Sequence, residues 1–105
     1  MKRGIFMRLF DLHCDTLGPA TDVRAAFSQN TLAVDLRRGR RFSSWTQTFA
    51  AWVPDGLSAA TARGRCAALL DTARRWMAET TDYCPVAGVA DLMGVEPAFR
   101  AILSV

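Results

Sequence analysis

Several residue types are scarce in this chain of 105 residues, and each scarcity narrows the class of protein. There is one histidine, His13, and there are three cysteines, Cys14, Cys66 and Cys84, with no C-x-x-C pair. An odd number of widely spaced cysteines indicates reduced thiols, not a disulfide framework or a zinc knuckle. No apolar run approaches the roughly 18–20 residues that span a bilayer. Arg8 interrupts the apolar start and no cleavage site follows, so we expect a cytoplasmic protein without a membrane segment.

Charge is concentrated in one place. The chain is 50% hydrophobic and 22% charged, which is typical of one small globular domain, and its net charge is +3. Four of its arginines fall within Arg37–Arg41. Such a cluster can bind nucleic acid or an acidic protein. However, no aromatic residue is interleaved and Asp35 lies beside it, so we interpret the segment as a solvated loop around Gly39 and keep binding through Arg37–Arg41 as an alternative.

The apolar pattern predicts strands that alternate with helices. The expected strands are Met7–Cys14, Phe42–Val53 and Ala101–Val105, with a short extended piece over Val86–Val89. The expected helices are Ala20–Phe27, Val34–Arg38, Ser58–Thr80 and Ala90–Phe99, with a turn at Gly18-Pro19 and a connector over Thr80–Pro85. This order predicts an α/β fold of right-handed βαβ units with a parallel sheet. Three strands leave open sheet edges, which predicts association.

The longest helix and the second strand supply the expected core. Ser58 is a good N-cap, and apolar residues recur along the helix at steps of three and four. Gly64 costs about 1 kcal/mol of helix propensity relative to alanine, a cost that a close approach to the sheet would offset. Four aromatic residues are expected in the core: Trp45, Phe49, Trp52 and Trp76. Thr46 and Gln47 are expected near the mouth of any barrel that such strands would form, and we assign them no role.

The end of the first strand holds a candidate metal site. Alternate side chains of a strand share a face, so Asp11, His13 and Asp15 are expected to point the same way. Zinc accepts an imidazole nitrogen and a carboxylate oxygen, and parallel α/β folds place ligands at the carboxyl ends of strands. A lone histidine near a strand is more often structural, and two ligands fall short of the three or four that zinc sites usually have. Cys14 faces the opposite side and is interpreted as a packing residue.

The segment Phe10–Leu17, with the sequence Phe-Asp-Leu-His-Cys-Asp-Thr-Leu, resembles the opening motif of the membrane dipeptidase (renal dipeptidase) family of zinc metallopeptidases. The resemblance continues in order along the chain. Asn30–Gly39 is similar to the family's stretch before its second strand, Trp45–Val53 to that glutamine-aromatic-alanine strand, and Ala101–Val105 to the third strand.

This resemblance implies a (β/α)8 TIM-type barrel with two zinc ions (Zn2+) that hydrolyses dipeptides. It maps two zinc ligands onto His13 and Asp15. Asp11 either orients His13 or is a polar strand residue. A glutamate that bridges the metals follows the family's third strand, beyond Val105, and the remaining ligands and substrate-binding residues come later still.

We therefore expect residues 1–105 to be the incomplete N-terminal part of a metal-dependent dipeptidase barrel, with no catalytic residue and no activity alone. A separately encoded C-terminal half or a second copy of the chain would be its partner. A polymerase and histidinol phosphatase domain is an alternative, since its first strand also begins with an Asp-Leu-His motif. That motif carries a second histidine where this chain has Asp15, and Trp45–Val53 fits the dipeptidase family better.

Overall fold

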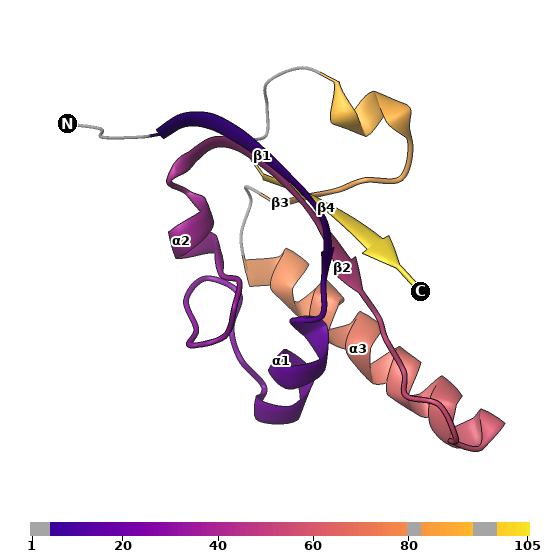
Figure 1. The fold of residues 1–105 in the computed structure, drawn as a ribbon. Helices are drawn as coiled ribbons and strands as arrows, with labels where there is room; N and C mark the ends of the chain where they lie inside the picture. Colours follow the sequence, from indigo (N-terminus) through magenta and orange to yellow (C-terminus); the bar gives the residue numbers. More distant parts are fainter. Residues whose placement is uncertain (1–4, 80–82, 94–98) are drawn as a thin grey trace.

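The computed structural model describes residues 5–79, 83–93 and 99–105, which form a parallel sheet backed by helices (Figure 1). In chain order the elements are β1 (Ile5–Cys14), α1 (Leu17–Val23), α2 (Leu36–Gly39), β2 (Phe42–Ala50), α3 (Ala59–Glu79), β3 (Tyr83–Pro85), the 3-10 helix η1 (Val89–Leu92) and β4 (Phe99–Ser104). The strand order is β1-β2-β4-β3, and every pair is parallel. The predicted α/β class and parallel sheet are confirmed. None of the described helices is long and apolar enough to cross a membrane.

The sheet contains one strand that the sequence pattern did not predict. Tyr83–Pro85 forms β3 and pairs with β4, so the expectation of a connector was wrong there. The extended piece expected over Val86–Val89 is not a strand, and the helix expected over Ala90–Phe99 is in part the 3-10 helix η1. A strand of three residues with a proline gives too short a pattern to separate from a loop. Residues 80–82 and 94–98, which complete those two predictions, lie outside the described residues.

The other expected elements are present with shifted boundaries. The helix predicted over Ser58–Thr80 is α3, and Ser58 caps it, since its Oγ accepts a hydrogen bond of 3.2 Å from the backbone N–H of Thr61. The turn predicted at Gly18-Pro19 was wrong, because both residues lie in α1. Proline is tolerated there because the first helical turn leaves its backbone N–H groups unpaired in any case.

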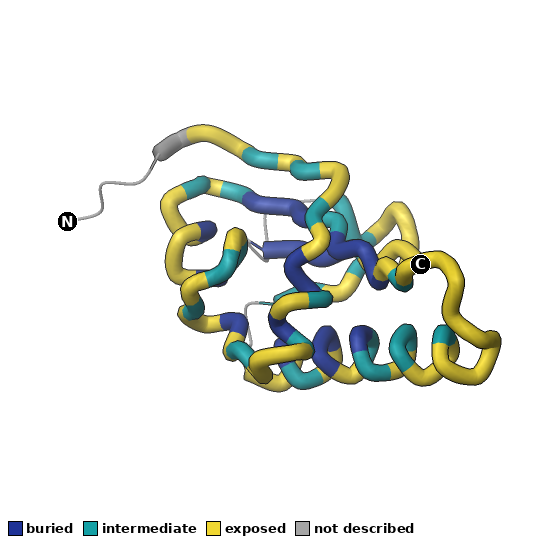
Figure 2. Tube along the Cα trace, turned by 60° about the horizontal axis from the view of Figure 1, so that its bottom comes forward, coloured by how far each residue is buried: buried dark blue, intermediate teal, exposed yellow. Residues whose placement is uncertain are grey.

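The core lies between β2 and β4 on one side and α1 and α3 on the other (Figure 2). Phe27 is at its centre. Its ring stacks on that of Trp76 with centroids 4.9 Å apart, and its centroid lies 5.2 Å from that of the Phe99 ring. Trp45, Phe49 and Trp76 are buried as predicted. Trp52 is 63% exposed, which corrects its expected place in the core. The cause is that β2 ends at Ala50, so Trp52 lies on a segment that has left the sheet.

The last turn of α3 holds the segment that follows α1. The indole N–H of Trp76 and the guanidinium of Arg75 each donate to the carbonyl oxygen of Ala25 at 2.9 Å. The Glu79 carboxylate accepts hydrogen bonds from the backbone N–H groups of Phe27 and Ser28, at 3.0 and 3.2 Å. These contacts hold the backbone around Phe27 in the position from which its ring packs in the core.

The short helix α2 is held by the buried carboxylate of Asp35 and by close contact between Gly39 and the Trp45 ring. Asp35 caps it, accepting from the backbone N–H groups of Arg38 and Asn30 at 2.8 and 2.9 Å. Burial of Asp35 alone would raise its pKa, but the hydrogen bonds from Arg38 and Asn30 outweigh burial and hold the pKa below its usual range. Gly39 lies so close to the Trp45 ring that a Cβ would overlap it, whereas a Cβ on Gly64 would meet nothing within 4 Å. No close approach therefore offsets the helix cost of Gly64, whereas Gly39 is in close contact with the sheet.

Candidate functional site

His13 and Asp15 converge at the carboxyl end of β1. The imidazole Nε2 of His13 lies 3.2 Å from Oδ2 of Asp15, and each side chain is 63% exposed. Because the sheet is parallel, this end of β1 lies at the same edge as the carboxyl ends of β2 and β4. That edge is where α/β proteins commonly place their ligands. The two predicted metal ligands are thus brought together, with both polar groups accessible.

A register shift near the end of β1 changes the face on which His13 lies. Asp11 pairs with Gln47 and Cys14 pairs with Phe49, so three steps on β1 match two on β2. Such a bulge contains one extra residue and reverses the alternation of side chains beyond it. Asp11 borders a cavity on the helix-covered face with Trp45 and Gln47, and Cys14 also packs against the core. His13 therefore lies on the open face of the sheet, and the expectation that Asp11 shares its face is wrong.

Asp11 contacts His13 through the main chain. Its Oδ1 accepts a hydrogen bond of 3.3 Å from the backbone N–H of His13. A bulge interrupts the ladder and leaves backbone groups without a partner strand, and a short polar side chain can supply the missing acceptor. Of the two roles considered for Asp11, a polar strand residue and an orienting partner, this geometry favours a residue that fixes the backbone under His13, not one that bonds the ring.

Cys14 is a packing residue, as interpreted from the sequence. It contacts the core from the end of β1. Burial raises the pKa of its thiol, hydrogen bonds from Thr16 act against this, and the charges of Asp11 and Asp15 raise the pKa further. A protonated thiol that faces the core is a poor metal ligand and a poor nucleophile, since thiolate is the reactive form.

His13 and Asp15 offer two groups that a metal ion could bind, which is fewer than a complete site needs. An imidazole nitrogen and a carboxylate oxygen on one exposed edge are ligand types that zinc accepts, so His13 and Asp15 fit the metal. Nowhere in residues 5–79, 83–93 and 99–105 do three His, Cys, Asp or Glu side chains group so that they could hold a metal ion. A complete tetrahedral site would need at least one more protein ligand from elsewhere.

The arginines of Arg37–Arg41 do not all point into solvent, because Arg38 makes contacts within the protein. Arg38 is used internally, with Nε 3.1 Å from Oδ1 of Asp35 and Nη2 2.6 Å from the carbonyl oxygen of Leu32. Arg37 and Arg41 are exposed. The interpretation of this segment as a solvated loop around Gly39 was wrong in part, because Arg37, Arg38 and the buried Gly39 lie in α2. Binding of nucleic acid or an acidic partner stays an untested alternative.

Sequence reasoning missed a cavity on the open face of the sheet. Gln47, for which no role was assigned, is 1% exposed and accepts a hydrogen bond of 3.1 Å from the Trp45 indole. Its neighbour Thr46 points the other way and lines a cavity of about 350 Å³. Arg8 and Arg100 line the same cavity. Their alternation along the strands was visible in the sequence, but the register that brings β1, β2 and β4 together was not.

The fold thus defines an α/β protein with a parallel sheet and with helices between strands. No protein-family model, curated protein or solved structure matches the chain. The resemblance to membrane dipeptidases rests on the sequence segments quoted above and stays a prediction.

Proposed function

We propose that this chain contributes the first strands of a zinc-dependent dipeptidase of the membrane dipeptidase type, with His13 and Asp15 as ligands of one zinc ion. The observation that carries the proposal is the approach of His13 Nε2 to Asp15 Oδ2 at the exposed carboxyl end of the first strand. The order of the sheet supports it, because β1, β2 and β4 are neighbours and parallel, as the first three strands of a (β/α)8 barrel would be.

The short strand β3 limits how a barrel would close. It pairs with Phe99–Ala101 on the outer edge of β4, where the next barrel strand would lie. A complementary segment would therefore pair alongside Ile102–Ser104 or displace β3. Since β3 has only three residues, displacement removes few hydrogen bonds.

The chemistry of such a site divides between metal and chain. Zinc, when bound, acts as a Lewis acid and lowers the pKa of a bound water. His13 and Asp15 supply one nitrogen and one oxygen ligand, and Asp11 holds the backbone N–H of His13 so that the imidazole keeps its place on the open face. The described residues provide no further ligand, so the isolated chain is proposed to bind zinc weakly and to be inactive.

The proposal is tested by titrating Zn2+ into the purified chain and following backbone amide shifts by NMR. We expect saturable shifts at residues 11–16, and a loss of affinity of at least about tenfold in His13→Ala and in Asp15→Ala. Asp71→Ala is the matched control, since this carboxylate on α3 is 73% exposed and remote from the site. Cys14→Ser separates thiolate binding from the proposed pair.

Two results would contradict parts of the proposal. Zinc shifts that persist unchanged in both His13→Ala and Asp15→Ala would remove these residues as ligands. Zinc-dependent hydrolysis of dipeptides by the purified chain, lost in His13→Ala, would show that the isolated chain is active after all.

A further inference from the structure

His13 and Asp15 lie at a spacing that suits two ligands of one metal ion. The Nε2 atom of His13 is 3.2 Å from Oδ2 of Asp15, and each side chain is 63% exposed. Two ligand atoms at about 2.0–2.2 Å from a tetrahedral zinc ion are about 3.3–3.5 Å from each other. An ion pair that is so exposed contributes little to stability, so a cation can replace it after a small movement of either side chain.

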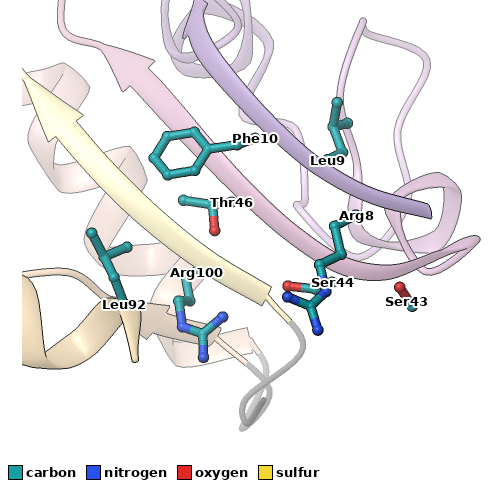
Figure 3. Close-up of a pocket in the computed structure, with 8 residues that line it drawn as sticks. All are labelled: Arg8, Leu9, Phe10, Ser43, Ser44, Thr46, Leu92 and Arg100. Atoms are coloured by element: carbon teal, nitrogen blue, oxygen red, sulfur yellow. The ribbon is translucent and has the colours of Figure 1, made fainter. Parts of the chain in front are cut away.

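A single chain leaves such an ion with open coordination positions. Structural zinc sites in proteins have four ligands, and the pair supplies two. Among the residues that the structure describes, no other His, Cys, Asp or Glu side chain completes the pair to a group of three. The cavity lined by Arg8, Thr46 and Arg100 offers no such ligand and lies beside the amino-terminal halves of β2 and β4 (Figure 3). The missing ligands must therefore come from outside the described residues of one chain.

The carboxyl end of the sheet, where the pair lies, also exposes large apolar side chains. Leu12 of β1 and Trp52, which follows β2, are both mostly exposed. Leu103 is exposed near the end of β4, where it is the register partner of Phe49. Three neighbouring strands thus expose apolar surface at the same end as two groups that can bind a metal ion. Exposed apolar surface is typical of protein–protein contacts.

We propose that one zinc ion joins two copies of this chain, with His13 and Asp15 of each copy as its four ligands. This inference rests on the proposed function, because it uses the same two ligands and names the partner that completes their site. Two-fold symmetry presents the same surface twice, so one pair of ligands becomes the two nitrogen and two oxygen atoms of a complete tetrahedral site.

Charge favours the joined site over a site on one chain. The two Asp15 carboxylates balance the charge of Zn2+, so the ion and its four ligands are neutral together. One zinc ion on a single pair keeps a net positive charge, which is costly to remove from water. The neutral arrangement can therefore be enclosed between two copies, together with the exposed side chains of Leu12 and Trp52.

The arrangement predicts a maximum in the dependence of dimer formation on zinc. Up to half an equivalent of Zn2+ per chain, each added ion recruits two chains, so the fraction of dimer rises. In a large excess of Zn2+, each chain binds its own ion and water completes the coordination, so the fraction of dimer falls. A zinc ion that only altered the fold of each chain would give no such maximum.

The test is sedimentation velocity of the full chain at increasing Zn2+ concentration in a phosphine reductant, with NMR amide shifts at residues 11–16 measured on the same samples. We expect the fraction of dimer to be lowest in EDTA, greatest near half an equivalent of Zn2+, and lower again in excess Zn2+. Addition of EDTA to the dimer should restore the first state.

Variants assign the ligands. His13→Ala and Asp15→Ala should each raise the dissociation constant of the dimer at least about tenfold, since each removes two of its four ligands. Both side chains are exposed, so neither change should disturb the fold. Asp71→Ala on α3 is the matched control and should leave the dimer unchanged. Cys66→Ala combined with Cys84→Ala should also leave it unchanged, which excludes bridging by thiolates.

Three results overturn the inference. These are a fraction of dimer that does not depend on Zn2+, a zinc-dependent dimer that persists in both His13→Ala and Asp15→Ala, and binding of one Zn2+ per chain with shifts at residues 11–16 but no dimer. The last of these results would leave the proposed function standing. The absence of zinc-dependent shifts at residues 11–16 would overturn both proposals.

Discussion

Gly39 carries the sharpest prediction for the stability of the fold. It is buried in α2, and the Trp45 ring packs against its Cα. In Gly39→Ala the new Cβ would overlap Cε3 and Cζ3 of the ring and lie 2.9 Å from Cη2. Carbon atoms in favourable contact are about 3.5–4.0 Å apart, so either the ring or α2 must move.

The ring has little freedom to move. Trp45 is 4% exposed, its ring centroid lies 4.4 Å from that of Phe99, and its indole N–H donates to Gln47. Moving α2 instead would disturb the hydrogen bonds that Asp35 makes to its first turn. Overpacking of this kind costs typically about 1–3 kcal/mol, and we expect Gly39→Ala near the upper end because both neighbours are held. For a domain of this size, that lowers Tm by about 10 °C or more.

Gly64→Ala is the matched control. Gly64 lies within α3 at an exposed position, where a Cβ would meet nothing within 4 Å. The same substitution should therefore raise the free energy of unfolding by about 0.5–1 kcal/mol through helix propensity. Urea denaturation followed by tryptophan fluorescence measures both variants. A Gly39→Ala protein as stable as the unaltered chain would refute the close contact of α2 with Trp45.

Two further predictions concern carboxylates that hold loops. The pKa of Asp35 is lowered in the folded state, so the stabilisation by its carboxylate is present above the unfolded pKa and is lost as pH falls through the folded value. Asp35→Asn should therefore lower the free energy of unfolding by about 1–3 kcal/mol at pH 7 and flatten the acid side of the stability–pH curve measured by urea denaturation. An unchanged curve would contradict this. Glu79→Ala should cost about 1–3 kcal/mol in the same assay, since the backbone N–H of Phe27 loses its acceptor. Asp71→Ala, which removes an exposed ion pair with Arg74, should change the free energy of unfolding by less than about 0.5 kcal/mol. Equal losses in the two alanine variants would show that the hydrogen bonds of Glu79 do not stabilise the fold.

Strand and helix identity could be predicted from the sequence where the apolar pattern was long enough. The short, mostly apolar run Met7–Cys14 and the apolar stripe along Ser58–Thr80 predicted β1 and most of α3, because burial imposes such patterns on strands and helices. β3 was missed because three residues carry too little pattern. Gly18-Pro19 was assigned to a turn because the same residues favour turns and the first turn of a helix.

The proximity of His13 and Asp15 was predicted from the sequence, but the sheet face on which they lie was not. The spacing of His13 and Asp15 indicated that they would meet, and they do. The bulge that separates Asp11 from their face is a property of strand pairing, so no local pattern shows it. The Arg8–Arg100 cavity was missed for a similar reason, since its residues come from strands more than ninety positions apart in the sequence. Sequence periodicity indicates which residues share a strand face, whereas register determines which strands meet.

The hydrogen bond between Phe27 and Glu79, at the end of α3, also has a consequence for folding during synthesis. Phe27 and its acceptor Glu79 are separated by 52 positions. At about 5–20 residues per second on the ribosome, the acceptor is made roughly 3–10 s after the ring it secures. During that interval β1 also waits for β2, since parallel strands cannot pair through a tight hairpin. The nascent chain therefore presents an unprotected aromatic residue and an unpaired strand for seconds, which makes early chaperone binding and synthesis rate the expected controls on its yield.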